Sequence, residues 1–118
     1  MLLSPNIIVT KQSLESDDSY DVIMSNIDSL NALFEAMVEY DEVSTDALYS
    51  YFVDYYLAQV NNGGFSQFVY NTGWDAFMVK HVREGLRALN AKQHSALFEQ
   101  SADLIEQFSQ EQFTQFLE

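Results

Sequence analysis

Residues 61–73 read NNGGFSQFVYNTG, and this stretch decides the fold because it interrupts a long apolar helical pattern. Asn and Gly accept backbone torsions with positive φ, so Asn61, Asn62 and Gly63 suit a left-handed helix C-cap. Gly64 would leave room for another helix to approach closely. The sequence therefore predicts a corner between two helices at this point.

The second half of the same stretch predicts a short helix and its end. Phe65 and Phe68 are three residues apart and would both pack inward. Asn71 and Gly73 repeat the stop signal before Trp74. A ligand-binding loop is the competing interpretation, but the glycine spacings that cradle phosphates, GxxxxGK[ST] and GxGxxG, do not occur. We therefore prefer the structural interpretation of this stretch.

Hydrophobic spacing predicts helices along most of the chain. The first follows Asp17-Asp18-Ser19, which can cap it. Its apolar stripe at helical spacing consists of Ile23, Ile27, Leu30, Phe34 and Met37. A second helix, from about residue 45 to 60, is apolar on nearly every face and is therefore expected at the centre. Further helices are expected over about 64–70 and 74–89, followed by a last long helix that Asn90 can cap and a tail with helical spacing.

Together these patterns predict an all-α fold, a single compact domain of about five or six helices over residues 1–118. The β-branched run Ile7-Ile8-Val9-Thr10 favours a short extended N-terminal arm within residues 1–16. No internal repeat or linker interrupts the pattern, so we expect no domain boundary.

The composition excludes several classes of protein. The chain has no Cys, which excludes disulfides, thiolate metal sites and thiol nucleophiles, and fits a reducing compartment. No apolar run approaches the roughly 20 residues that span a bilayer, and no signal-peptide pattern follows Met1. We expect a cytoplasmic protein without a membrane anchor.

Charge is the most unusual property of the sequence. Eighteen Asp and Glu face five Lys and Arg, a formal net charge of −13. Direct binding to nucleic acid or to an anionic membrane requires cationic groups, so the charge argues against both and for a basic partner. No Lys or Arg occurs from residue 12 to 79, and four of the five cations lie between Lys80 and Lys92.

Carboxylates recur at a regular interval in the cation-free segment. Asp21, Asp28, Glu35 and Glu42 are seven residues apart, which on one helix gives a slowly drifting line with about 10.5 Å between members. Exposed helices usually mix charges to form i,i+4 pairs, and this segment does not. The carboxylates expected to contact a basic partner are Asp17, Asp18, Asp21, Asp28, Glu35, Glu39, Asp41, Glu42 and Asp46. The plain alternative is a solvated helix face.

The segment YFVDYYLAQVNNGGFSQFVYNTGW, residues 51–74, resembles the signature block of a bacterial family of acidic helical domains whose best-known member is a DNA mimic. EGLRALNAKQHSALFEQ, residues 84–100, is similar to the family's next segment, and the resemblance covers most of residues 20–100. The matching motif positions are Asn62, Gly63, Gly64, Phe65, Gln67 and Asn71. The resemblance implies an acidic, all-α homodimer that occupies the DNA-binding surface of a helix-turn-helix transcription factor.

Other functions remain open at this point. An immunity-type inhibitor of a basic nuclease toxin would use the same electrostatic attraction, and charge that serves only solubility would need no partner. A small enzyme would use His81 and Glu84 near the Asn-Gly corner, but one His-Glu pair is too few for a carboxylate-bridged metal site. We expect no catalytic residue, metal or cofactor. Lys80, Arg83 and Arg87 are expected to neutralise acids within the fold or across a dimer.

Overall fold

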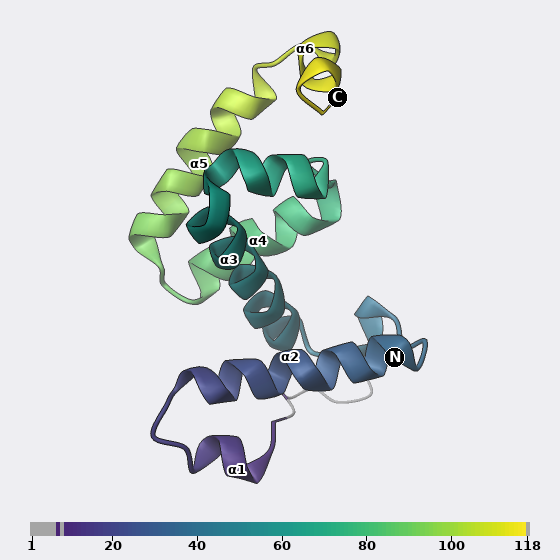
Figure 1. Ribbon diagram of the computed structural model, residues 1–118, viewed down its shortest axis with the longest axis vertical. Helices are drawn as coiled ribbons and strands as arrows, with labels where there is room; N and C mark the ends of the chain where they lie inside the picture. The colour runs from purple at the N-terminus through teal and green to yellow at the C-terminus, as the bar shows by residue number, and fades with distance from the viewer. Residues whose placement is uncertain (1–6, 8, 118) are drawn as a thin grey trace. The chain divides into compact units, whose positions relative to one another are not determined.

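The computed structural model describes residue 7 and residues 9–117 (Figure 1). Over these residues it contains six α-helices, one 3₁₀ helix and no strand, which confirms the all-α expectation. The helices are α1 (Lys11–Leu14), α2 (Tyr20–Glu35), the 3₁₀ helix η1 (Tyr40–Glu42), α3 (Thr45–Thr72), α4 (Ala76–Ala88), α5 (Lys92–Glu106) and α6 (Gln110–Leu117). None of these helices is both long enough and apolar enough to cross a membrane.

The contacts divide the chain into an N-terminal unit, Met1–Asp54, and a C-terminal unit, Tyr55–Glu118. The boundary falls inside the sequence of α3, which contributes its first turns to one unit and its later turns to the other. The division into two units does not test whether residues 1–118 form a single domain, so the single domain remains a prediction.

In the N-terminal unit, α2 is held by α1 on one side and by the start of α3 on another. The backbone N–H of Thr10, which caps α1, donates to Ser25 Oγ of α2 at 2.8 Å. The Asn26 side chain, only 2% exposed, donates to the carbonyl of Ala47 in α3 at 3.0 Å. Among the described residues of this unit, the large apolar side chains that are buried are Leu30, Val43, Leu48, Phe52 and Val53.

The N-terminal arm is not extended throughout the range expected for it. Lys11–Leu14 form α1, because the Thr10 hydroxyl accepts the Ser13 backbone N–H at 3.1 Å and provides a cap that hydrophobic spacing does not reveal. The remainder of the expected arm includes residues 1–6 and 8, which lie outside the described residues.

Helix α2 ends earlier than its apolar stripe predicts. Met37 has φ of 68° and is 86% exposed, so its expected place on the buried stripe is wrong. The Met37 N–H donates to Phe34 O and the Val38 N–H to Leu33 O, both at 3.0 Å. These two bonds form a Schellman motif, which closes the helix around a left-handed residue.

Asn90 has the same role at the end of α4. Its φ is 57°, its N–H donates to Arg87 O, and the N–H of Ala91 donates to Leu86 O. Asn90 therefore closes α4 instead of capping α5, whose N-cap residue is Ala91. The sequence identified the break correctly and assigned it to the wrong helix.

The core of the C-terminal unit is aromatic. Phe68 and Phe98 are fully buried, and the rings of Tyr56, Phe65 and Trp74 surround them with centroid separations of 4.9–6.4 Å. Helices α4 and α5 lie next to each other, and α4 contributes the buried residues Val79, Val82 and Leu86. Aromatic edge-to-face packing of this kind fixes the two arms of the predicted corner against α5.

The corner itself lies at Gly63 and Gly64, which separate two helical stretches within α3. Gly63 has φ of −150° and Gly64 has φ of 79° with ψ of 179°. The positive φ is therefore at Gly64, and the left-handed cap expected over Asn61, Asn62 and Gly63 is wrong. Nothing lies near a Cβ built on Gly64, so its torsion, and not the close approach of a helix, requires glycine there.

Amide side chains close the corner. Gln59 Oε1 accepts from Gln67 Nε2 at 3.0 Å and from Asn71 Nδ2 at 2.7 Å, while Asn62 Nδ2 contacts Gln67 Oε1 at 3.5 Å. Gly73, with φ of 64°, ends α3 through its N–H bond to Val69 O, as expected from the repeated stop signal. The stretch 61–73 is thus a structural corner in this fold.

Candidate acidic surface

All nine carboxylates expected to contact a partner belong to the N-terminal unit. Eight of them are exposed, and Glu42 is half-buried. This unit contains eleven Asp and Glu and one Lys, so it carries a formal −10 of the chain's −13. The charge is therefore concentrated in one structural unit and is not spread evenly along the chain.

Three of the nine carboxylates share one face of α2. Asp21, Asp28 and Glu35 lie on the same helix at seven-residue intervals, and all three are exposed. Each heptad drifts by about 20° around the axis, so the three remain on one side of the helix. The opposite side holds the buried residues Asn26 and Leu30. The periodic line predicted from the sequence is confirmed for these three positions.

Glu42, the expected fourth member, does not continue the line. It lies in η1, beyond the end of α2, and its carboxylate accepts the backbone N–H of Glu39 at 2.8 Å. The Glu39 side chain in turn accepts the backbone N–H of Glu42, which completes a capping box. Both carboxylates therefore stabilise η1. Glu42 is seven residues after Glu35 in the sequence, but the two residues do not belong to the same helix.

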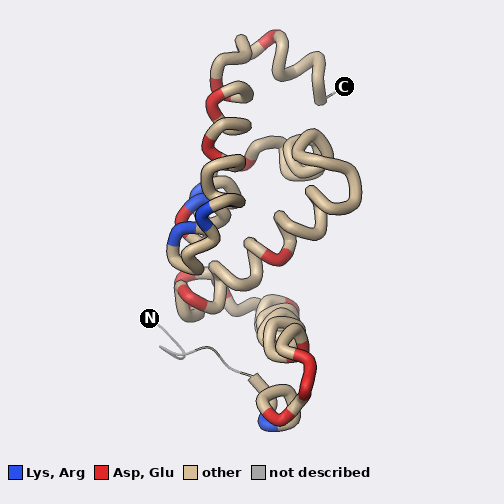
Figure 2. Tube along the Cα trace, turned by 90° about the vertical axis from the view of Figure 1, so that its left-hand side faces the viewer, with Lys and Arg blue, Asp and Glu red and all other residues tan. Residues whose placement is uncertain are grey.

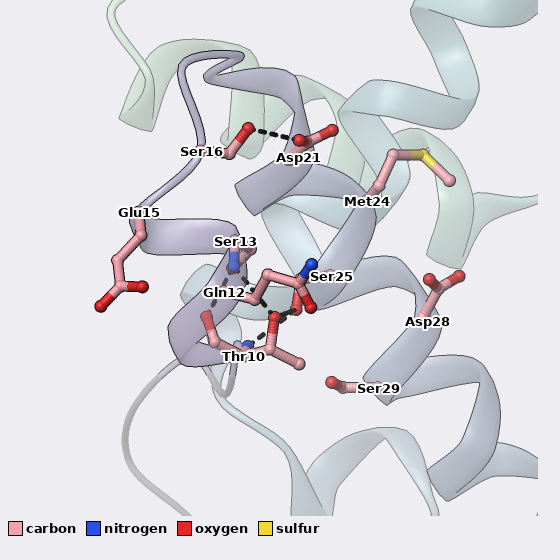
Figure 3. Close-up of a pocket in the computed structure, with 10 residues that line it drawn as sticks. All are labelled: Thr10, Gln12, Ser13, Glu15, Ser16, Asp21, Met24, Ser25, Asp28 and Ser29. Carbon is pink, nitrogen blue, oxygen red and sulfur yellow. Dashed lines mark hydrogen bonds between the residues drawn. The ribbon is translucent and has the colours of Figure 1, made fainter.

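The remaining acids lie at helix starts. Asp18 Oδ1 accepts the backbone N–H of Tyr20 at 3.0 Å, and Asp21 Oδ2 accepts from Ser16 Oγ at 2.5 Å (Figure 3). Asp46 is in the first turn of α3, where a carboxylate complements the helix dipole. Asp17 and Asp41 are exposed on either side of α2 in the sequence. Asp18, Asp21 and Asp46 therefore combine a local structural role with an exposed charge.

None of the nine carboxylates forms an ion pair with any described Lys or Arg. Lys11, the one cation of this unit, is 3.9 Å from Glu15. Arg83 and Arg87 pair with Glu99 and Glu106 inside the C-terminal unit, as expected for them. Lys80, for which the same role was expected, forms no ion pair among the described residues. The nine carboxylates thus remain available to cations of another molecule.

A polar hollow of about 560 Å³ adjoins the acidic face of α2 (Figure 3). Its wall from α2 includes Asp21, Met24 and Asp28, and its other wall comes from α1 and the residues around it, with Glu15 at the edge. Met24 is 37% exposed between the two aspartates. Carboxylate and hydroxyl oxygens around an exposed thioether suit a long cationic side chain, whose methylenes pack on apolar atoms while its charged end meets oxygen.

At the alternative site of His81 and Glu84, the His81 ring has contacts within α4 itself. His81 Nδ1 is 2.9 Å from the carbonyl of Phe77, one turn earlier, and its ring lies 4.2 Å from that of Phe77. Asp75, the nearest sequence neighbour with a carboxylate, caps α4 by accepting the N–H of Met78 at 3.0 Å. Within residues 9–117, no three His, Asp or Glu side chains are grouped so that they could hold a metal ion.

Two features of these sites were not predicted from the sequence. Gln59, the acceptor at the centre of the corner, gave a weak signal: it is an amide in an otherwise apolar helical segment, 8 residues before Gln67 and 12 before Asn71. Met24 gave none, because its place in the wall of the hollow follows from how α1 and the residues around it lie beside α2. Both depend on contacts between residues distant in the sequence.

The comparison with protein families identifies one relationship. The profile of the family described as DMP19-like protein matches residues 41–118. The match contains the corner, α3 to α6 and three of the nine carboxylates, and it starts later and ends later than the resemblance inferred over residues 20–100. No curated protein and no solved structure gives a significant match. Because the family profile covers more than half of its residues, the chain belongs to the DMP19-like protein family.

Proposed function

We propose that this protein is an acidic binding protein that acts as a DNA mimic, occupying the DNA-binding surface of a basic partner such as a helix-turn-helix transcription regulator. The observation that carries the proposal is the set of exposed carboxylates in the N-terminal unit that form no ion pair with a described cation. Membership of a family named after a DNA-mimic protein supports it. Binding is stoichiometric and involves no catalytic step, metal or cofactor.

The α2 carboxylates match duplex DNA in the sign of their charge, and sparsely in their spacing. Asp21, Asp28 and Glu35 are about 10.5 Å apart along the helix, whereas duplex DNA carries one charge per about 1.7 Å of axis. One copy therefore imitates selected phosphates and not a continuous backbone. A homodimer would double the array towards the 6–10 phosphates that a DNA-binding protein commonly contacts, and we include a homodimer in the proposal.

The charge distribution also determines how the complex forms. A unit with a formal −10 attracts a basic protein over several ångströms and raises the association rate at low salt. Because the carboxylates are exposed, salt screens them with a Debye length of about 8 Å at physiological ionic strength. The proposal therefore includes steep salt dependence of binding, in the cytoplasm where transcription regulators act.

The test is a capture experiment with matched charge variants. The full chain is immobilised and incubated with host lysate at low salt. The bound proteins are then released with a salt gradient and identified by mass spectrometry. The variant Asp28→Lys/Glu35→Lys reverses two α2 charges that have no capping role. The control Asp103→Lys/Glu111→Lys makes the same charge change at exposed positions of α5 and α6.

We expect a basic DNA-binding protein to bind the wild type and the control, and to lose at least about tenfold in affinity for the α2 variant at unchanged helicity. The identified partner should release its DNA when the wild-type chain is added. Normal binding by the α2 variant, or simultaneous binding of DNA and this chain, contradicts the proposal. Recovery of a basic nuclease whose activity is blocked would instead identify an immunity-type inhibitor.

A further inference from the structure

The C-terminal unit contains a second hollow, of about 360 Å³, with the opposite charge character. Its cations are Lys80, Arg83 and Arg87, which lie at spacings of three and four residues on α4 and therefore on one side of that helix. Figure 2 shows blue Lys and Arg segments grouped in this part of the chain. Its apolar lining includes Trp74 and Val79. Three of the chain's five Lys and Arg therefore line this hollow, together with the carboxylates of Glu84 and Glu106.

Both arginines form ion pairs within the C-terminal unit, and Arg83 is the more tightly held of the two. Arg83 Nε is 2.7 Å from Glu99 Oε1, its Nη2 is 3.5 Å from Glu106, and its guanidinium lies 5.6 Å from the centroid of Phe98. Arg87 Nη2 is 3.5 Å from the same Glu99 oxygen. A guanidinium has five N–H donors, and these contacts leave several of them unused at each arginine. The arginines therefore offer unused N–H donors at the hollow, although Glu99 and Glu106 offset part of their charge.

Lys80 differs from the arginines because its charge is not compensated. Its side chain is exposed and forms no ion pair within the described part of the chain. Glu84 and Glu106 also line the hollow, but Glu106 already contacts Arg83. The Lys80 ammonium group, with three donors, lines the hollow and is not within ion-pair distance of either carboxylate.

The apolar side of the hollow is shaped by an unusual backbone. Trp74 has φ of 56° directly after Gly73 with φ of 64°, a left-handed conformation that side-chain-bearing residues other than Asn and Asp rarely adopt. The Trp74 indole stacks on Phe98, at 6.0 Å between centroids and 22° between planes. A strained residue held by its surroundings at the wall of a cavity is typical of a binding site.

We propose that this hollow binds a small organic anion, a carboxylate or phosphate-monoester group attached to a flat apolar body. The anionic group contacts Lys80 and the free donors of Arg83 and Arg87, and the apolar body lies against Trp74 and Val79. Small-molecule sites are usually lined by apolar side chains with a few polar groups that orient the ligand. This site is independent of the acidic surface and lies in the other unit.

The test uses the full chain and its own reporter, since Trp74 is the sole tryptophan. Benzoate and phenyl phosphate are titrated while Trp74 fluorescence and the NMR shift of its indole N–H are followed. Inorganic phosphate supplies the charge without the apolar body, and benzyl alcohol supplies the apolar body without the charge. We expect saturable binding of at least one aromatic anion, with Kd on the order of 1–10 mM for so small a ligand.

Matched lysine variants separate the site from the general charge. Lys80→Gln should weaken the aromatic anion about three- to fivefold, the range expected for one exposed charge pair. Lys92→Gln removes the same charge at a residue that does not line this hollow, and should change Kd by less than about twofold. Both residues are exposed, so circular dichroism should show unchanged helicity in each variant.

Four results would overturn the proposal: no saturable change in either Trp74 signal, benzyl alcohol binding as well as benzoate, inorganic phosphate binding as well as phenyl phosphate, or equal weakening by the two lysine variants. Benzoate alone or phenyl phosphate alone as the tighter ligand identifies the anionic group and supports the site in either case. None of these results bears on the acidic surface of the N-terminal unit.

Discussion

The side-chain carboxamide of Gln67 occupies the position that a Cβ atom on Gly63 would take. A Cβ built there lies 2.8 Å from Gln67 Cδ and 3.0 Å from Gln67 Cβ. The same Gln67 amide donates to Gln59 at 3.0 Å. Glycine is therefore needed at position 63 because a Cβ atom there would collide with Gln67, and at position 64 because of the backbone torsion. Replacing either glycine should destabilise the corner, but for a different physical reason at each position.

For Gly63→Ala we expect a loss of about 1 kcal/mol in the free energy of unfolding, because the methyl group displaces Gln67 and breaks its bond to Gln59. Urea denaturation measures it. In a Gln67→Ala background the same substitution should cost less than half as much. An undiminished cost in that background would show that Gln67 is not the obstacle.

For Gly64→Ala we expect a loss of about 1–3 kcal/mol, since φ of 79° with ψ of 179° is a region that is almost restricted to glycine. No neighbouring atom lies near the new methyl group, so the cost is torsional. Gln67→Ala should leave it unchanged, in contrast to the result at position 63. A Gly64→Ala protein as stable as the wild type would contradict the torsional explanation.

Glu35 lies in the last turn of α2, where its negative charge opposes the helix dipole. Glu35→Gln should therefore raise the free energy of unfolding by about 0.3–1 kcal/mol at low salt. Asp46→Asn, in the first turn of α3, should lower it by a similar amount. Thermal unfolding at low and high salt checks both, and both differences should shrink as salt is added.

The Tyr20 hydroxyl donates to Asp54 Oδ1 at 2.7 Å, and this bond is the main reason that the pKa of Tyr20 is raised, with desolvation second. Burial raises the pKa of Tyr51 and of Tyr56 as well. Because the folded state holds these protons more tightly, their contribution to stability is complete below about pH 10 and is lost as pH rises through the folded-state pKa values.

Tyr20→Phe should therefore make unfolding less sensitive to pH above about pH 10 and remove one late-titrating phenol from the absorbance titration at high pH. Tyr70→Phe, at an exposed tyrosine of the C-terminal unit, is the control. Equal pH dependence of unfolding in wild type and Tyr20→Phe would show that the Asp54 bond does not hold the proton in solution.

Glu99 should matter more for stability than Glu106. One Glu99 oxygen contacts both Arg83 and Arg87, and its side chain is 35% exposed, whereas Glu106 contacts Arg83 at 3.5 Å and is 52% exposed. We expect Glu99→Gln to cost about 1 kcal/mol and Glu106→Gln less than about 0.5 kcal/mol in urea denaturation. Equal costs would mean that the 2.7 Å contact contributes no more than a surface pair.

Local rules determined much of this protein. The periodicity of apolar residues predicted helices because helix formation depends on residues three and four positions apart. The glycines at 63 and 64 and the stop at Asn71 and Gly73 predicted the corner because backbone torsions are a property of each residue. The block of acids without cations was visible in the sequence, and so was the exposed line of Asp21, Asp28 and Glu35 once α2 was expected.

Tertiary structure decided the rest, because it depends on contacts that are remote in the sequence. The need for glycine at position 63 follows from where the Gln67 amide lies, and that amide is hydrogen-bonded to Gln59, eight residues before it. The seven-residue interval counted Glu42 with α2 because sequence spacing does not record that a Schellman motif ends the helix at Glu35. The pairing of Arg83 with Glu99, 16 residues away, requires α4 and α5 to be packed together, and this packing also created the cationic hollow beside Trp74.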